Sequence, residues 1–379
     1  MNFQRLNLNH PRFSEIEDFR HMPNAAAKPT PFIPDNFAET IPLIPEPILS
    51  QHRCLEPNDT RFTAAARLLQ SLWRQDQNLP IGRHRSPSGE TREIGSRLSM
   101  AAGRAGANFL NPSIASLVRR ELIYREIGAC IDADRLFRNL LSSMPLVFNL
   151  FGLLKHDPEL ATRVMRLVLP GFTGNVTQVL FEHSPGRGHP AFTADYSAFD
   201  AFVRYRTEDG KKGFIAVEQK YTETLQETTQ PTRPHLDRLS EQYGLYKDPH
   251  ADSLRNNPCQ QLWREHLLAA SMTQRGIYDE GTFVVIAPRL NWYAQNRIAA
   301  YARHLKKPEA RQPAFTGIFL ERFIEAIGTA GEPDFAQRLH QRYCDFARID
   351  RIIDAYLEIE DQAGIEVFPI RHFESLQQK

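Results

Sequence analysis

Residues 197–223 read SAFDAFVRYRTEDGKKGFIAVEQKYTE, and this stretch decides the fold. Two runs rich in Phe, Val, Ile and Tyr flank a polar break at 208–210. The pattern predicts a β-hairpin in which the glycine of the break adopts the left-handed conformation that a turn requires. Asp200 lies in the first strand of this hairpin. Glu218 and Lys220 lie two residues apart in the second strand, so their side chains project from the same face of the sheet.

The length of the turn decides whether these acidic and basic side chains meet. A two-residue turn would place Asp200 opposite Gln219, which points to the wrong face. A three-residue turn at 208–210, with Gly210 in the bulge position, would place Asp200 directly opposite Glu218. We predict the three-residue turn.

Directly opposed carboxylates suggest a cation site. They repel one another, so a sheet that holds them normally needs a cation between them. Mg²⁺ (or Mn²⁺) is the expected ion, because one or two carboxylates, water and a substrate phosphate suffice to hold it. Lys220 can then position the attacking water and neutralise charge on the reacting phosphate. The alternative is a half-exposed strand with an unremarkable surface Glu and Lys, and a short D…ExK pattern alone does not exclude it.

Several further stretches strengthen the first of these interpretations. They are SSMPLVFNLFG at 142–152, FEHSPGR at 181–187, AFDAFVRY at 198–205, GFIAVEQKYTE at 213–223, NPCQQLWREHLLA at 257–269 and RYCDF at 342–346. Together and in this order, they resemble the PD-(D/E)xK, or restriction-endonuclease-like, nuclease superfamily, in particular an uncharacterised bacterial branch of predicted restriction endonucleases. The resemblance covers most of the chain from about Arg83 onward.

The resemblance implies an α/β fold and a set of site residues. The expected core is αβββαβ, a mixed sheet flanked by helices, with helical elaborations at both ends of the chain. Asp200 and Glu218 are the implied metal ligands, and Lys220 is the implied catalytic lysine. Glu182, at the end of a strand predicted over 175–183, is a further acidic residue that would bind metal or orient water. The alternative at Glu182 is a surface carboxylate at the edge of the sheet.

Two glutamines are further candidates for the site. Gln260 and Gln261 lie in the first turn of a helix predicted to begin at Asn257-Pro258, with the asparagine as N-cap and the proline in the first helical position. In some related nucleases, glutamines at this place reach the metal-bound water or the phosphate. The alternative is that they only solvate the start of the helix.

An arginine-rich stretch precedes the core. Residues 81–107 carry five arginines and only two glutamates in a setting that contains Gly and Ser, which predicts a loop. Arg83, Arg85 and Arg97 are candidates for holding substrate phosphates. A solvated loop with scattered arginines is the alternative.

The chain divides into four expected regions. These are a Pro-rich extended arm at 1–58, a helical and basic-loop region at 59–130, the nuclease-like core at 131–290 with an insertion at 222–256, and a helical C-terminal region at 291–379. The arm holds nine of the 26 prolines, which disfavour helix and central strand. We also expect one helix over 134–154, kinked at Pro145.

Composition limits the function classes. The formal net charge is only +1, so a nucleic-acid surface must be a local patch. The four cysteines show no CxxC spacing, which fits a reducing cytoplasm and disfavours a zinc cluster. No apolar run reaches membrane-spanning length. We therefore expect a cytoplasmic protein with no membrane partner.

The leading hypothesis is a divalent-metal-dependent nuclease, with DNA as the expected substrate. One alternative is a nuclease-like domain that binds nucleic acid or a protein partner without cutting. Another is an enzyme that uses the same core for a different metal-assisted phosphate reaction. A homodimer would suit cutting of a duplex, although nothing in the sequence demands one.

Overall fold

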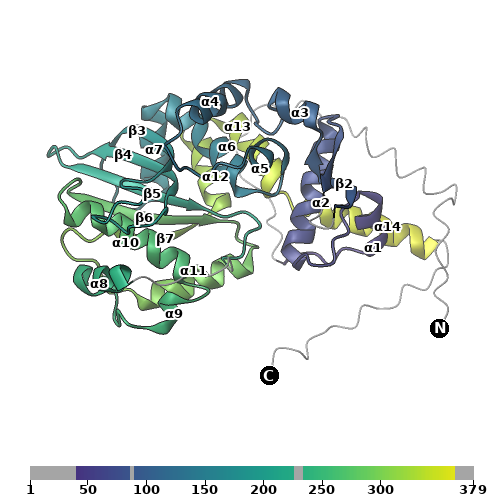
Figure 1. Ribbon diagram of the computed structural model, residues 1–379. Coiled ribbons are helices and arrows are strands. Elements are labelled where there is room, and N and C mark those ends of the chain that lie inside the picture. The colour runs from purple at the N-terminus through teal and green to yellow at the C-terminus, as the bar shows by residue number, and fades with distance from the viewer. Residues whose placement is uncertain (1–39, 86–88, 226–233, 363–379) are drawn as a thin grey trace.

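The computed structural model describes residues 40–85, 89–225 and 234–362 (Figure 1). Its strands are β1 (Ile81–Arg85), β2 (Thr91–Leu98), β3 (Asn175–His183), β4 (Phe199–Arg206), β5 (Lys212–Gln219), β6 (Glu280–Ala287) and β7 (Ala314–Phe319). Its helices are α1 (Glu46–Gln51), α2 (Arg61–Asp76), α3 (Met100–Ala105), α4 (Pro112–Ile123), α5 (Ala133–Arg138), α6 (Ser143–His156), α7 (Pro158–Val168), α8 (Pro234–Tyr243), α9 (Asp252–Arg255), α10 (Gln260–Gln274), α11 (Trp292–His304), α12 (Leu320–Thr329), α13 (Pro333–Tyr343) and α14 (Ala347–Gln362).

A five-stranded mixed sheet organises the molecule. The strand order is β3-β4-β5-β6-β7, with β3, β4 and β5 antiparallel to one another and β5, β6 and β7 parallel. Helix α10 carries the chain from β5 to β6, as a parallel connection requires. The succession α6, β3, β4, β5, α10, β6 confirms the predicted αβββαβ core, to which α7 and β7 are additions.

Helices cover both faces of this sheet, and β5 shows how its residues divide between them. Ile215 and Val217 belong to the core that includes α6, α7 and α12, whereas Phe214 and Ala216 belong to the core that includes α8, α10 and α11. Figure 1 shows these two helical layers above and below the strands. Because side chains alternate along a strand, Glu218 follows the register of Phe214 and Ala216 and faces α10.

The hairpin of β1 and β2 lies beyond the ends of the central strands and packs on α2, with α14 alongside (Figure 1). The core next to α6 extends from Ile44 to Tyr356, so the first and last helices share it. The division into four regions stays a prediction. None of the helices in the described part of the chain has the length and apolar character needed to cross a bilayer.

Two expectations for the N-terminal half are wrong. The Pro-rich arm lies largely outside the described residues, but its end forms α1 instead of an extended segment. Pro45 is the N-cap and Pro47 lies in the first turn, where a missing backbone N–H costs no intrahelical bond. The arginine-rich loop expected at 81–107 contains the β1–β2 hairpin and α3. The polar and apolar residues of 91–98 alternate too weakly to have revealed the strand.

The helix expected over 134–154 is also two helices rather than one. Helix α5 ends at Arg138, and α6 begins at Ser143 with Ser142 as its N-cap. Pro145 therefore lies in the first turn of α6, where it is tolerated and produces no kink in a longer helix. Of the predicted insertion at 222–256, residues 226–233 lie outside the described chain, and α8 and α9 are its short helices.

Candidate functional site

The β4–β5 hairpin brings the predicted acidic residues face to face. Its ladder pairs Ala201 with Val217, so continuing the register by one residue places Asp200 opposite Glu218. The turn has three residues, closed by a hydrogen bond of 3.1 Å from the Thr207 amide to the Lys211 carbonyl. Gly210 has a φ of +82°, as the bulge position requires. The predicted turn and pairing are confirmed.

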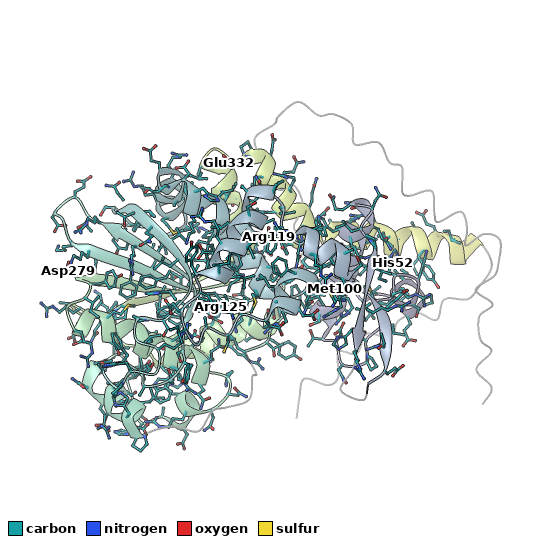
Figure 2. All side chains as sticks on the ribbon, turned by 45° about the horizontal axis from the view of Figure 1, so that its top comes forward. His52, Met100, Arg119, Arg125, Asp279 and Glu332 are labelled. Carbon is teal, nitrogen blue, oxygen red and sulfur yellow. The ribbon has the colours of Figure 1, made fainter. Side chains whose placement is uncertain are left out.

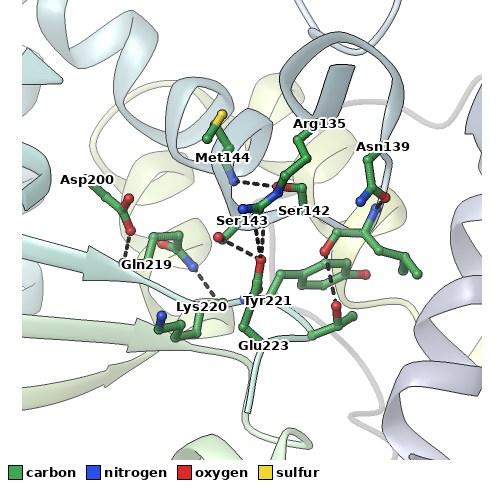
Figure 3. Close-up of polar contacts among 12 residues, drawn as sticks. Arg135, Asn139, Ser142, Ser143, Met144, Asp200, Gln219, Lys220, Tyr221 and Glu223 are labelled. Carbon is green, nitrogen blue, oxygen red and sulfur yellow. Dashed lines mark hydrogen bonds and ion pairs between the residues drawn. The ribbon is translucent and has the colours of Figure 1, made fainter. Parts of the chain in front are cut away.

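Lys220 meets Glu218 on this surface. Its ammonium nitrogen lies 2.9 Å from Glu218 Oε1, and both side chains are only 6 % exposed. The Lys220 amide donates to the Ile286 carbonyl at 2.8 Å, which fixes the backbone at the point where β5 ends. Asp200 Oδ2 accepts a 2.7 Å hydrogen bond from the Gln219 amide (Figure 3). The hairpin and β6 thus hold two carboxylates and one ammonium together.

Helix α10 adds an amide and a third carboxylate. Gln261 donates from Nε2 to Glu218 Oε1 at 2.8 Å and to Glu265 Oε1 at 2.9 Å, and its Oε1 accepts from Lys220 at 3.0 Å. The side chain of Gln260 points elsewhere: its Nε2 donates to the Arg255 carbonyl at 2.8 Å. The structure therefore brings Gln261 to the predicted site.

The start of α10 also departs from the expectation. The helix begins at Gln260, with Cys259 in the N-cap position, and not at Asn257-Pro258. Instead, the Asn256 carbonyl accepts hydrogen bonds from the amides of Cys259 and Gln260. Glu265 did not emerge from the sequence, although it lies four residues after Gln261 and hence on the same side of the helix.

Glu182 lies at the end of β3, where the strand was predicted. Its φ of +48° is a left-handed conformation that a glutamate adopts only at an energetic cost, and such residues concentrate at functional sites. It also lines a pocket together with Tyr124, Arg125 and His183. The β3–β4 register runs from the Phe181–Ala201 pair to the His183–Phe199 pair, which places Glu182 next to Asp200, the residue opposite Glu218.

Burial and mutual repulsion disfavour the charged forms of these acids. Burial first, and then the charge of Glu218, raises the pKa of Glu182 to about 7. Burial, Glu218 and Glu182 raise the pKa of Asp200 well above its ordinary value, against the opposing effect of Lys220. The pKa of Glu265 is raised by burial and then by Glu218. One lysine does not neutralise this group of carboxyls.

The donor set fits a divalent cation. Carboxylate oxygens are the ligands that Mg²⁺ and Mn²⁺ prefer, and a cation would relieve the repulsion that raises these pKa values. Among the described residues, no hydrogen-bond partner reaches the buried Glu265 Oε2, and a bound cation would satisfy this oxygen. Within 40–85, 89–225 and 234–362, no three His, Cys, Asp or Glu side chains already converge as a formed metal site. Glu218 is instead turned toward Lys220 and Gln261.

Glu223 anchors the chain just beyond Lys220 and was not recognised as a site residue from the sequence. Its Oε1 accepts from the amide and hydroxyl of Ser143, at 3.0 and 2.8 Å, and lies 3.4 Å from Arg135 (Figure 3). Its Oε2 accepts from the Tyr221 amide at 2.9 Å. A carboxylate thus occupies the N-terminus of α6, where the helix dipole favours negative charge. This contact ties the end of β5 to α6.

The predicted phosphate-binding arginines lie on the N-terminal hairpin. Arg83 and Arg85 are in β1 and Arg97 is in β2. Arg83 lies 3.7 Å from Glu93, and Arg97 forms an ion pair with Asp134. These pairs reduce the positive charge that the two arginines offer to a phosphate.

The comparisons with known proteins agree with this geometry. A family model described as the PD-(D/E)XK nuclease superfamily matches residues 57–345, which include β3, β4, β5 and α10. Neither the curated proteins nor the solved structures contain a significant match. Nucleases of this superfamily typically use divalent metal ions. Because the family model covers well over half of the sequence, the chain belongs to the PD-(D/E)XK nuclease superfamily.

Proposed function

We propose that this protein is a metal-dependent nuclease that hydrolyses phosphodiester bonds, with DNA as its substrate. The observation that supports this most strongly is the placement of Asp200 opposite Glu218 with Lys220 bonded at the same surface. A purely structural role gives no reason to bury this set of charges together, since burying charge is costly. We also infer a cytoplasmic location, because all four cysteines are free thiols.

The proposed chemistry assigns a role to each side chain. Asp200 and Glu218 would hold Mg²⁺ or Mn²⁺, with Glu182 as the further acidic ligand. The bound ion supplies Lewis acidity and lowers the pKa of water. Lys220 orients the attacking water and donates hydrogen bonds to the phosphate oxygens as negative charge builds up on them. A new bond forms between the water oxygen and phosphorus, and the bond from phosphorus to one sugar oxygen breaks.

The first experiment compares cutting of plasmid and single-stranded DNA, with Mg²⁺ or Mn²⁺, by the wild type and the variants Lys220→Ala and Asp200→Ala. Each substitution is expected to lower the cleavage rate at least a hundredfold, the typical effect of losing one group that stabilises the transition state. Lys211→Ala is the matched control, because Lys211 is an exposed lysine at the other end of the same hairpin. It should cut at the wild-type rate.

Two results would contradict the proposal. Cutting that persists in Lys220→Ala would point to a contaminating enzyme. If the wild type binds DNA but does not cut it with either ion, the protein is instead a binding module built on a nuclease fold. Circular dichroism of all variants shows whether they are equally folded, so a loss of activity cannot be mistaken for unfolding.

A further inference from the structure

The exposed aromatic side chains of the described residues come from segments at one end of the central sheet. Within the described residues, those exposed over more than a third of their surface are Tyr124, Tyr196, Trp292, Tyr293 and Phe319. We call this set the aromatic edge, because all five lie where the central strands end next to the acidic site. An exposed aromatic ring forgoes the large gain of burial, so such a cluster indicates a ligand.

Tyr124 lies beside Glu182. It follows α4, is 81 % exposed and lines the pocket that Glu182 and His183 also line. The neighbouring Glu126 fixes this segment, because its carboxylate contacts His183 Nδ1 at 2.6 Å and accepts from the Ser184 amide at 3.0 Å. Burial would raise the pKa of Glu126, but these contacts hold it below its ordinary value. The ring of Tyr124 is thus presented from an anchored segment.

The ring of Tyr196 lies beside Gly128, in the segment that follows Tyr124. It is 66 % exposed and precedes β4, whose first residue, Phe199, pairs with His183. Arg187 links it to the site, donating to the Tyr196 carbonyl at 3.2 Å and to the Glu182 carbonyl at 2.9 Å. Both tyrosines therefore belong to the segments that meet at the end of β3, where Glu182 lies.

The other three aromatic residues border the opposite side of the site. Trp292 and Tyr293 begin α11, directly after Asn291, whose side chain donates to the Tyr221 carbonyl at 2.8 Å. Trp292 is 63 % exposed. Phe319 is the last residue of β7, and the guanidinium of Arg289 lies 5.1 Å from its ring centre.

Strand directions explain why these segments share an edge. Because β3, β4 and β5 are antiparallel to one another in turn and β5, β6 and β7 are parallel, the end of β3, the start of β4 and the ends of β5, β6 and β7 lie at the same end of the sheet. Lys220 lies on this same side. Figure 2 places the exposed Arg125, next to Tyr124, at the same ends of the strands. Several separate segments thus bring aromatic rings and arginines to the end of the sheet that holds the acidic site.

We propose that the aromatic edge binds the unpaired bases of single-stranded nucleic acid and leads the strand to Asp200, Glu218 and Lys220. This inference deepens the proposed nuclease function and rests on it for the reaction, although not for binding. Unpaired bases expose faces that stack on aromatic side chains, while nearby arginines hold the phosphates. In a duplex the bases are stacked on each other, so their faces are not available to stack on aromatic side chains. An extended strand also matches a ligand site spread over several segments better than a compact ligand does.

The test measures binding in EDTA, so that no cutting takes place. The probes are a fluorescently labelled oligothymidylate and a duplex of the same length. We expect the single strand to bind at least tenfold more tightly than the duplex. Tyr124→Ala and Trp292→Ala should each weaken single-strand binding about tenfold, the effect of losing one stacked base, and leave duplex binding unchanged. Tyr124→Phe keeps the stacking face and should bind like the wild type.

Trp292 provides a second readout, because Trp73 and Trp263 are buried. Stacking should quench its fluorescence when the oligonucleotide is added, and Trp292→Ala should lose that quenching. Ile277→Ala is the control, since Ile277 is a partly exposed apolar residue that precedes β6, at the opposite edge of the sheet.

Three results would overturn the inference. They are unchanged single-strand binding in Tyr124→Ala and Trp292→Ala, an equal loss of duplex binding, or a wild-type dimer that these variants convert to monomer, which would make the aromatic edge a contact between copies. Because binding is measured without cutting, the outcome is separate from the proposed activity. A wild type that stacks the single strand but never cuts would refute only the nuclease.

Discussion

Glu265 determines which way the amide of Gln261 faces. The two amide hydrogens of Gln261 go to Glu218 and Glu265, so the amide oxygen is left to accept from Lys220. Glu265 is 5 % exposed and holds the Gln261 amide by accepting from its Nε2 at 2.9 Å, so we expect it to act as a positioning residue. Its influence on the reaction would pass through Gln261.

For Glu265→Gln, we expect the single-turnover cleavage rate to fall about tenfold while the metal concentration for half-maximal rate stays the same. The substituted amide can donate to Gln261, so the Gln261 amide is free to turn and Lys220 loses a fixed acceptor. The measurement is single-turnover cleavage over a titration of Mn²⁺, with Mn²⁺ affinity measured separately by calorimetry. Glu321→Gln is the control, as Glu321 is another buried glutamate that accepts from a backbone amide. A loss of Mn²⁺ affinity would instead make Glu265 a ligand.

At the scale of single residues, the sequence predicts those site residues whose positions depend only on local backbone geometry. Asp200, Glu218 and Lys220 follow from one hairpin, because the turn length sets the register and strand alternation sets the face. Glu265 depends on how α10 packs on β5, which is a tertiary contact with no local signal. Glu223 lies in one of the stretches that resemble the family, but its contact with Ser143 depends on where α6 packs, which the sequence does not show.

Among the elements, the N-terminus of α6 depends on a carboxylate from elsewhere in the chain. Glu223→Gln removes the charge that accepts from Ser143 and Tyr221 and lies near Arg135. We expect the free energy of unfolding to fall by about 1–2 kcal/mol, from weaker charge-assisted hydrogen bonds and loss of the helix-dipole interaction. Urea unfolding followed by circular dichroism measures it. Glu208→Gln, in the exposed β4–β5 turn, should change stability by no more than about 0.5 kcal/mol. Equal effects of the two substitutions would argue against the anchor.

The elements also show where sequence patterns mislead. The apolar runs of β5 and β6 were recognised because both faces of these strands are buried, which leaves a continuous signal. The hairpin of β1 and β2 lacks that signal because much of it is exposed, and its arginines favoured the prediction of a loop. The kink predicted at Pro145 is wrong, because a proline inside a helix and one in its first turn look alike until the N-cap, Ser142, is known.

At the scale of the whole molecule, buried polar groups join distant parts of the chain. Arg342 is fully buried, donates to Asn108 and Gln70, and stacks 3.9 Å from the centre of the Trp73 ring. Gln70 in turn donates to Tyr221, directly after Lys220. The N-terminal helices, α13 and the end of β5 are therefore held by one network, which no local pattern could predict.

Buried histidines link the stability of the whole molecule to pH. His266 is 1 % exposed, lies 2.9 Å from the Tyr301 hydroxyl and 3.0 Å from the Pro313 carbonyl, and burial lowers its pKa to about 4. Below about pH 6.5, His266 binds a proton in the unfolded chain but stays neutral in the native protein. This difference lowers the free energy of unfolding increasingly as the pH falls toward 4. The buried acids with raised pKa values act in the opposite direction, so only a comparison between variants isolates the histidine.

His266→Gln makes that comparison, because a glutamine amide can donate to Pro313 and accept from Tyr301 without titrating. The variant is expected to be less stable than the wild type at pH 7, because the ring is lost from a packed core. The difference in unfolding free energy should shift by about 2 kcal/mol in favour of the variant between pH 7 and pH 5, which corresponds to the 1.5 pH units below 6.5. Urea unfolding at the two pH values measures it, with the exposed His250→Gln as control. A difference that does not change with pH would mean that His266 takes up its proton as readily in the folded protein as in the unfolded chain.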